Sequence, residues 1–357
     1  FGSSLVWLAR RASTIRSFGA KASRYLKPTL HSNQDPMSAG WEVAKKCPVV
    51  FVSSIILTLY VIYVRTHGVT MLRSSDIARS SRGWIQLCIF HILFSLMAIS
   101  YTLAIMVQPG SVPNSPEWTV DKQDAPETVE TKRSGARRHC KWCCRYKPDR
   151  CHHCRVCRSC VLRMDHHCPW IHNCVGYFNY KFFFLLLFYA VLTSIFIAVT
   201  MAESVKEAID NDTPFGRMFC LLFAETLSCF LAMLVTIFFG FHVWLMLRAM
   251  TTIEFCESST KKTIGTRSPY DLGFLHNLQA NLGPNPFLWL VPVPSNSGDG
   301  LNFASERKGL LASSQSRRSS AHGSSRKKHA SDATSPVGSP PRTPSPRKPE
   351  SDAEQQP

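Results

Sequence analysis

Residues 140–174 read CKWCCRYKPDRCHHCRVCRSCVLRMDHHCPWIHNC and hold nine of the fourteen cysteines of the chain, together with five histidines. Thiolates and imidazoles are the ligands that zinc prefers, four to each tetrahedral site. Three pairs have the three-residue separation of a zinc knuckle: Cys140/Cys143, Cys154/Cys157 and Cys157/Cys160. Two closed sites would use eight of these side chains, so the stretch predicts two metal sites and leaves some cysteine over.

One of the remaining cysteines has chemically useful neighbours. In Asp165-His166-His167-Cys168 an acid, two imidazoles and a thiol are adjacent. A histidine oriented by the aspartate can take the proton of Cys168 and generate a thiolate nucleophile, although a histidine near a cysteine is more often a metal ligand than a base. The residues thus allow a purely structural zinc module, a cross-braced finger like those of ubiquitin ligases, or a zinc-stabilised scaffold that holds a catalytic thiol.

The hydrophobic residues, which make up 45% of the chain, collect in four long runs. These runs are 48–64, 84–107, 182–202 and 218–247. Runs of this length and polarity predict transmembrane helices. The expected fold is an α-helical integral membrane protein with four transmembrane helices and a small cytosolic two-zinc cysteine-rich domain between the second and the third.

Charge predicts the orientation of these helices. Four spans place both termini and the cysteine block on one side, and the loop 203–217 on the other side is mainly acidic. The positive-inside rule therefore predicts that the basic segments and the cysteine block are cytosolic, where thiols stay reduced. The loop between the first and second runs does not fit this orientation, because it contains four arginines and only one acidic residue, Asp76. The arginines are Arg65, Arg73, Arg79 and Arg82.

The segments outside the runs differ in composition. Residues 1–46 are basic and have no acid before Asp35, like a mitochondrial transit peptide, but Met37 just before the first run favours a start there. The loop 108–181 holds the cysteine-rich domain, from about residue 137 to 181, and residues 248–300 form a C-terminal element. The basic, Ser- and Pro-rich tail 301–357 predicts disorder. The net charge of +17 beside a bilayer favours contact with anionic lipid, and no nucleic acid partner is expected.

Some polar residues fall inside the apolar runs. Gln86 and His91 in the second run are expected to form hydrogen bonds with neighbouring helices. Glu225 and His242 lie in the fourth run, where an ionisable residue is a functional candidate by default. Glu225 is close enough to the end of its run to reach the interface, which favours a structural role.

The motifs taken together form a recognisable series. The pair Cys140-x2-Cys143 precedes Lys147-Pro148-Asp149-Arg150, His152-His153-Cys154-x2-Cys157-x2-Cys160, Asp165-His166-His167-Cys168-Pro169-Trp170, Asn173-Cys174-x-Gly176 and Asn179. This series closely resembles the cysteine-rich domain of the DHHC protein S-acyltransferases (palmitoyltransferases). The resemblance covers residues 41–294 and includes Thr251-Thr252-Ile253-Glu254 after the fourth run, and Asn277 with Gly283. One departure is Gln108-Pro109-Gly110, where the family usually has Asp-Pro-Gly.

The resemblance implies a role for each residue of the block, which spacing alone does not choose. It implies one zinc ion held by Cys140, Cys143, His153 and Cys160, and a second held by Cys154, Cys157, His167 and Cys174. It leaves Cys168 as the nucleophile, His166 as the general base and Asp165 as the group that orients His166. Cys144 and Cys151 fall outside these sets.

The implied reaction is protein S-palmitoylation. Cys168 would take a long-chain acyl group from acyl-CoA, such as palmitoyl-CoA, and pass it to a membrane-proximal cysteine of a protein substrate. The phosphates of CoA need cations, for which four basic residues are candidates by position: Arg137, Arg138, Lys147 and Arg150. The implied location is the endomembrane system (Golgi, ER or plasma membrane), with the site and both termini cytosolic. The main alternative is a catalytically silent, zinc-stabilised membrane adaptor.

Overall fold

A computed structural model describes residues 46–120, 128–132, 134–260 and 267–304. The predictions about Met37 and about the tail from residue 305 onward lie outside these residues. The described residues all belong to one compact unit, within residues 1–308.

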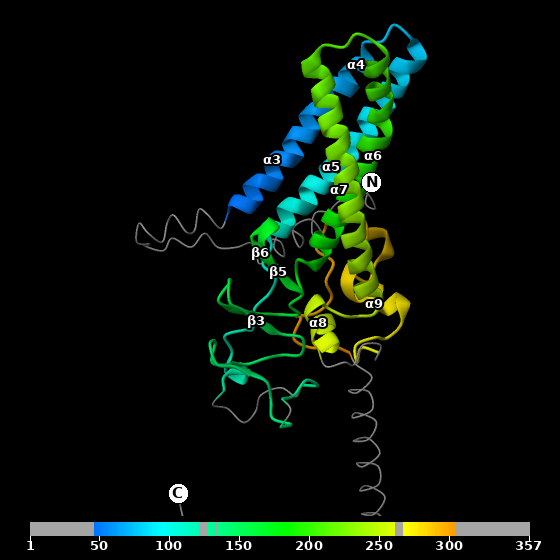
Figure 1. The fold of residues 1–357 in the computed structure, drawn as a ribbon. Coiled ribbons are helices and arrows are strands. Elements are labelled where there is room, and N and C mark those ends of the chain that lie inside the picture. Colours follow the sequence, from blue (N-terminus) through cyan, green and yellow to red (C-terminus); the bar gives the residue numbers. More distant parts are fainter. Residues whose placement is uncertain (1–45, 121–127, 133, 261–266, 305–357) are drawn as a thin grey trace, which may run out of the picture. The chain divides into compact units, whose positions relative to one another are not determined.

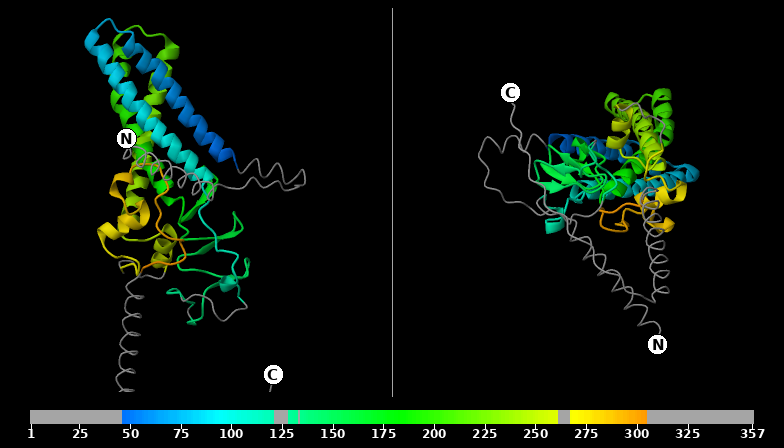
Figure 2. Two further views of the ribbon diagram at one scale, coloured as in Figure 1. Left: turned by 180° about the vertical axis from the view of Figure 1, so that it is seen from behind. Right: turned by 90° about the horizontal axis from the view of Figure 1, so that it is seen from below.

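Four helical segments in the described part of the chain are long and apolar enough to cross a membrane. They are Cys47–Leu72, which comprises α3 (Cys47–Ile62), a π-helical turn (Tyr63–Gly68) and α4 (Val69–Leu72), then α5 (Ile77–Met106), α6 (Tyr180–Asp210) and α7 (Phe215–Leu247). The helices run side by side, and the cysteine-rich segment follows α5 and precedes α6 (Figures 1 and 2). The predicted class, a multi-pass helical membrane protein with its metal-binding segment between helices two and three, is confirmed.

Helix α5 begins before the second apolar run because Asp76 caps it. The Asp76 carboxylate accepts a hydrogen bond from the backbone N–H of Ala78 at 3.0 Å, which satisfies one of the free donors at the helix start. The extra turns bring Arg79 and Arg82 onto α5, opposite the end of α6. Arg79 makes a bidentate ion pair with Glu207, and Arg82 lies 3.2 Å from Glu203. Two arginines counted in the first loop are thus paired with two acids at the end of α6.

Gln86 and His91 form hydrogen bonds between neighbouring helical segments, as predicted. The ring of His67, which is 1% exposed, donates from Nε2 to Gln86 Oε1 at 3.0 Å and accepts at Nδ1 from Ser204 at 2.8 Å. His91 accepts at Nε2 from the Tyr60 hydroxyl at 3.2 Å. His67 lies in the π-helical turn, where the altered backbone spacing turns its ring toward both neighbouring helices.

The cysteine-rich segment folds into three short antiparallel hairpins. They pair β1 (His139–Cys140) with β2 (Arg145–Tyr146), β3 (His152–Cys154) with β4 (Ser159–Val161), and β5 (His166–Cys168) with β6 (Asn173–Val175). The first two hairpins turn alike: Cys144 and Arg158, each just after the second cysteine of a knuckle, have φ of 50°. This left-handed residue closes the tight turn that points both thiols of a knuckle inward.

The third hairpin is tied to the end of α5 through two asparagines. Asn173 donates from its amide to the carbonyls of Ala104 and Val107, at 3.1 and 2.9 Å. Asn179 donates to the carbonyl of Val107 at 3.3 Å and to that of Cys174 at 2.8 Å, and it accepts from the N–H of Gly176 at 2.8 Å. Because these amides satisfy backbone groups at the helix end, the hairpin that carries Asp165 to Cys168 is fixed against the spans.

A C-terminal element follows α7. It consists of α8 (Thr252–Thr260), α9 (Phe274–Leu282) and a 3-10 turn, η4 (Pro286–Leu288). Asn277 on α9 donates to the carbonyl of Leu247 at 2.9 Å, and Asn281 accepts from Arg163 of the cysteine-rich segment. The element therefore joins the end of α7 to the metal-binding segment.

Candidate active site and metal centres

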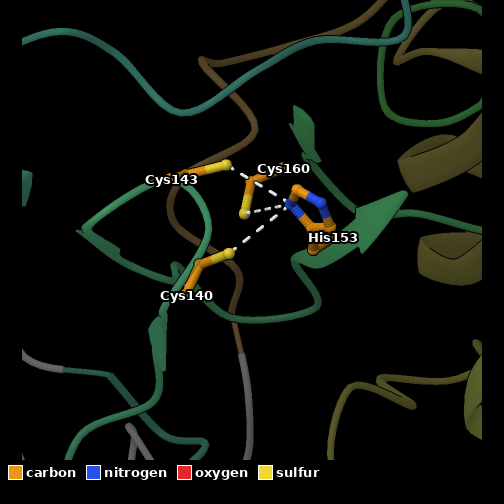
Figure 3. Close-up of side chains that lie close together, drawn as sticks. All are labelled: Cys140, Cys143, His153 and Cys160. Carbon is orange, nitrogen blue, oxygen red and sulfur yellow. Dashed lines mark hydrogen bonds between the residues drawn. The ribbon is translucent and has the colours of Figure 1, made fainter. Parts of the chain in front are cut away.

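The first metal-binding group combines two hairpins. Cys140 and Cys143 come from the first knuckle, His153 from β3 and Cys160 from β4, and their side chains converge on one point (Figure 3). Nδ1 of His153 lies 3.5 Å from Sγ of Cys140, 3.3 Å from that of Cys143 and 3.9 Å from that of Cys160.

The second group repeats this arrangement one hairpin further along the chain. Cys154 and Cys157 come from the second knuckle, His167 from β5 and Cys174 from β6. Nδ1 of His167 lies 3.6, 3.4 and 3.5 Å from the sulfurs of Cys154, Cys157 and Cys174. These are the two sets of four that the family resemblance implied.

Both groups fit zinc. With Zn–S bonds of about 2.3 Å and Zn–N bonds of about 2.0 to 2.1 Å, a tetrahedral ion requires S···N separations of about 3.6 Å and S···S separations of about 3.8 Å. The S···N distances above, and the 3.5 Å between the sulfurs of Cys157 and Cys174, are close to those values. Three thiolates and one imidazole per site is a zinc-type donor set. The two groups can therefore hold two metal ions, which would cross-link the three hairpins.

Cys168 belongs to neither group. It ends β5 one residue after His167, and its side chain, 5% exposed, packs into the apolar cluster between the spans. Tyr101 and Phe183, from α5 and α6, belong to the same cluster. The finger in which Cys168 is itself a metal ligand is thus not the arrangement observed. Of the other surplus cysteines, Cys144 is exposed and Cys151 is buried against the first group.

The acid and the imidazole beside Cys168 are in contact. Nδ1 of His166 donates to Oδ2 of Asp165 at 2.7 Å, and Asp165 is fully buried. Because Nδ1 is engaged by the carboxylate, Nε2 is left to take the proton of the Cys168 thiol, whose interaction with the ring favours the charged imidazolium. Asp165 therefore fixes both the tautomer and the direction of the ring.

Thr252 is a partner of Asp165 that sequence reasoning did not identify. It donates to the carboxylate twice, from its backbone N–H at 3.0 Å and from its hydroxyl at 2.8 Å. The start of α8 holds Thr252 in place through a reciprocal capping box: Thr251 accepts from the N–H of Glu254 at 3.2 Å, and Glu254 accepts from the N–H of Thr251 at 2.9 Å. The spacing Thr-x-x-Glu was a signal for this cap, but the contact with Asp165 joins residues 87 positions apart.

These contacts set the charge of the pair. Burial opposes ionisation of Asp165, but the hydrogen bond and charge of His166, aided by Thr252, hold the pKa of the carboxyl below its ordinary value. Burial likewise opposes the imidazolium, but the bonds to Asp165 and Cys168 outweigh it and raise the pKa of His166 to about 9. The site can therefore hold an anionic acid against a cationic histidine.

Aromatic and polar groups surround the pair. Phe183 lies edge-on to His166 with ring centroids 5.1 Å apart, and His242 of α7 lies 5.9 Å away. The sequence marked His242 as a candidate without indicating this neighbour. A cavity of about 400 Å³ opens beside the pair, and its lining includes one face of α8. The lining residues are Asp165, His166, Thr252, Ile253, Cys256, Glu257 and Thr260.

Arg150, one of the four basic residues named as candidates for the CoA phosphates, is already engaged within the protein. Arg150 is 4% exposed and makes two hydrogen bonds, of 2.7 and 2.8 Å, to the carboxylate of Glu254. It also donates to the carbonyl of Ala249 at 3.0 Å and stacks over Tyr270. A guanidinium whose donors are used in this way holds α8 against the cysteine-rich segment and is not free for a ligand.

A buried thiol beside an oriented histidine, next to two metal-binding groups at the end of four spans, defines a class: a membrane protein with a candidate nucleophilic cysteine. Comparison with known proteins gives the family. A profile of the DHHC palmitoyltransferase domain matches residues 133–259. The probable protein S-acyltransferase 15 of Arabidopsis thaliana is 38% identical over 245 residues, which cover 64% of this chain and 92% of that protein. The chain belongs to the DHHC palmitoyltransferase family.

Two animal relatives agree with this assignment. The palmitoyltransferase ZDHHC15 of Mus musculus is 42% identical over 171 residues, which cover 48% of this chain and 51% of the relative. The palmitoyltransferase ZDHHC2 of Danio rerio is 32% identical over 288 residues, covering 74% and 77%. The chain thus spans about half the length of the mouse relative.

Proposed function

We propose that the chain is a protein S-acyltransferase that uses Cys168 as its nucleophile. The observation that carries this proposal is the position of Cys168, outside both metal-binding groups and beside a histidine whose other nitrogen is held by Asp165. A purely structural zinc module or a silent adaptor needs His167 but has no use for an oriented His166 and a free thiol.

The first step loads the enzyme. The Cys168 sulfur attacks the thioester carbon of a long-chain acyl-CoA, the bond from that carbon to the CoA sulfur breaks, and CoA leaves with the proton that His166 held. Asp165 keeps the imidazolium paired throughout, which lowers the cost of its charge in a buried site.

The second step transfers the acyl group from Cys168 to the protein substrate. The thiol of a cysteine in a protein substrate gives its proton to His166, its sulfur attacks the acyl carbon, and Cys168 leaves as a thiolate. Two zinc ions would be held by Cys140, Cys143, His153 and Cys160, and by Cys154, Cys157, His167 and Cys174. They would supply cross-links that fix the hairpins carrying His166 and Cys168.

The position of Cys168 between membrane spans favours a substrate with a long acyl chain. Each methylene of an acyl chain kept out of water contributes about 0.8 kcal/mol. The apolar cluster that surrounds Cys168 lies between the spans, so a long chain on its sulfur would enter the bilayer region. We infer that the acceptors are membrane-proximal cysteines, that the site and both termini face the cytosol, and that the protein resides in the endomembrane system.

A two-stage assay tests the proposal. Purified protein mixed with palmitoyl-CoA should release about one CoA per chain in a burst, and a cysteine-containing acceptor peptide added afterwards should take up the acyl group. The variant Cys168→Ser should give no burst, whereas Cys144→Ser should behave as the native protein. A burst of unchanged size in Cys168→Ser would rule out Cys168 as the nucleophile.

A further inference from the structure

An uncharged stretch near the end of the described chain exposes large apolar side chains. Residues 283–294 read GPNPFLWLVPVP. Phe287 is 91% exposed, Leu290 54% and Val291 40%. In a surface that faces water, exposed apolar groups of this size within five residues mark a site of contact with something apolar.

Hydrogen bonds to α6 give the depth of this stretch. The apolar part of α6 between Lys181 and Glu203 has 21 residues, which at 1.5 Å per residue span about 32 Å, close to the thickness of a bilayer hydrocarbon core. Lys181 therefore marks the boundary on the side of the metal-binding segment. Its ammonium group donates to the carbonyl of Leu288 at 2.7 Å. Tyr189, about 12 Å further along the helix axis, donates from its hydroxyl to the carbonyl of Leu290. The stretch thus runs alongside α6 on the membrane side of the boundary.

Non-helical backbone is tolerated at that depth only where its polar groups have partners. Four of the twelve residues are prolines, which have no N–H to satisfy. Two carbonyls are satisfied by Lys181 and Tyr189, and the indole of Trp289 donates to the carbonyl of Gly283 at 2.8 Å. Most of the remaining backbone N–H groups find acceptors within the stretch itself. These belong to Phe287, Leu288, Trp289, Val291 and Val293.

We propose that residues 286–291 form a re-entrant element that inserts into the leaflet on the side of the metal-binding segment, with Phe287, Leu290 and Val291 against lipid acyl chains. Bilayer lipid is favoured over a protein partner because the stretch lies at the depth where lipid surrounds α6, and because it carries no charge for a partner to recognise. The inserted residues thus add a contact with lipid to the hydrogen bonds by which α6 and α7 already hold the C-terminal element. This inference does not depend on the proposed acyl transfer.

Photo-crosslinking in a bilayer tests the insertion. The full chain with Phe287→p-benzoylphenylalanine, reconstituted in phosphatidylcholine vesicles and irradiated, should gain the mass of one phospholipid on the peptide that contains position 287. The same substitution at Glu117 is the control and should gain none, because Glu117 is exposed and its neighbour Trp118 packs against the metal-binding segment. Cross-linking of position 287 to a second copy of the chain, or the absence of a lipid adduct, would overturn the proposal.

A milder substitution covers the case in which the bulky photo-label disturbs folding. In Phe287→Cys, a water-soluble maleimide should label position 287 at least about ten times more slowly in vesicles than it labels Glu117→Cys, because ionised thiol and reagent both avoid the hydrocarbon region. Detergent solubilisation should remove most of that difference. Equal labelling rates in vesicles would show that position 287 faces water and would overturn the insertion.

Discussion

Glu254→Gln isolates the ion pair that joins the cysteine-rich segment to α8. Glutamine keeps an oxygen that can accept from the N–H of Thr251, so the helix cap survives. It removes the charge that faces Arg150, whose guanidinium has 4% of its surface exposed and forms two hydrogen bonds to the Glu254 carboxylate. The variant therefore leaves a buried cation with only neutral acceptors, among them the carbonyl of Ala249.

The expected cost follows from that burial. Removing one partner of a buried ion pair costs about 3 to 5 kcal/mol, because the other charge stays desolvated. Since 1 kcal/mol shifts the thermal midpoint by about 2 to 4 °C in a folded unit of about 150 to 250 residues, a range that includes the described part of this chain, the lower figure predicts a fall of about 6 to 12 °C. The assay is thermal unfolding in detergent at equal zinc content. The double variant Arg150→Met with Glu254→Gln removes both charges and should be more stable than Glu254→Gln alone.

The pH dependence gives an independent check on the same pair. Burial alone would raise the pKa of Glu254, but the charge of Arg150 and its hydrogen bonds hold that pKa below its ordinary 4.5. A carboxyl with a lowered pKa contributes stability above its unfolded pKa and loses it as pH falls through the folded value. The difference in thermal unfolding midpoint between the native protein and Glu254→Gln should thus stay constant from pH 7 to about pH 5 and become smaller below about pH 4.5. A midpoint shift under about 2 °C at pH 7, or a difference that grows on acidification, would refute the reasoning.

Two further variants test the site and the metal groups. Thr252→Val removes the hydroxyl that bonds Asp165 at 2.8 Å; we expect acyl-enzyme formation in a single turnover to slow about tenfold, the equivalent of about 1.4 kcal/mol, with zinc content unchanged and with Thr252→Ser close to native. An unaltered rate in Thr252→Val would mean that the hydroxyl does not support Asp165. Cys143→Ser should lower bound zinc, measured by atomic emission, from two ions per chain to one and should destabilise the first hairpin. Its adjacent control Cys144→Ser should keep both ions, and loss of zinc in the control instead would reverse the ligand assignment.

Local patterns in the sequence were enough to predict much of the fold. Uncharged runs predicted the spans, and the three-residue cysteine separations predicted the knuckles, because both features depend on neighbouring residues. The spacing did not reveal which cysteine completes each site. Cys160 follows Cys157 at knuckle spacing, yet it joins Cys140 and Cys143 in the first group, because β4 pairs with β3 and faces the first knuckle.

Contacts between residues far apart in the chain could not be predicted from the sequence. Thr252 bonds Asp165 across 87 positions, and Arg79 bonds Glu207 across 128. The second contact joins the start of α5 to the end of α6, so an arginine counted in the first loop is paired with an acid that precedes the third loop. Arg150 was retained as a candidate for the CoA phosphates for the same physical reason, because its acidic partner Glu254 lies on another helix and is not evident from the sequence.

The central claim is that Cys168 carries the acyl group, and mapping the modified cysteine by mass spectrometry tests it most directly. After incubation with palmitoyl-CoA and digestion, the native protein should carry a hydroxylamine-labile palmitoyl group on the peptide that contains Cys168. The group should be absent from Cys168→Ser, which should still bind two zinc ions. A palmitoyl group found on another cysteine, such as Cys256, with Cys168 unmodified, or labelling that persists undiminished in Cys168→Ser, would contradict the account.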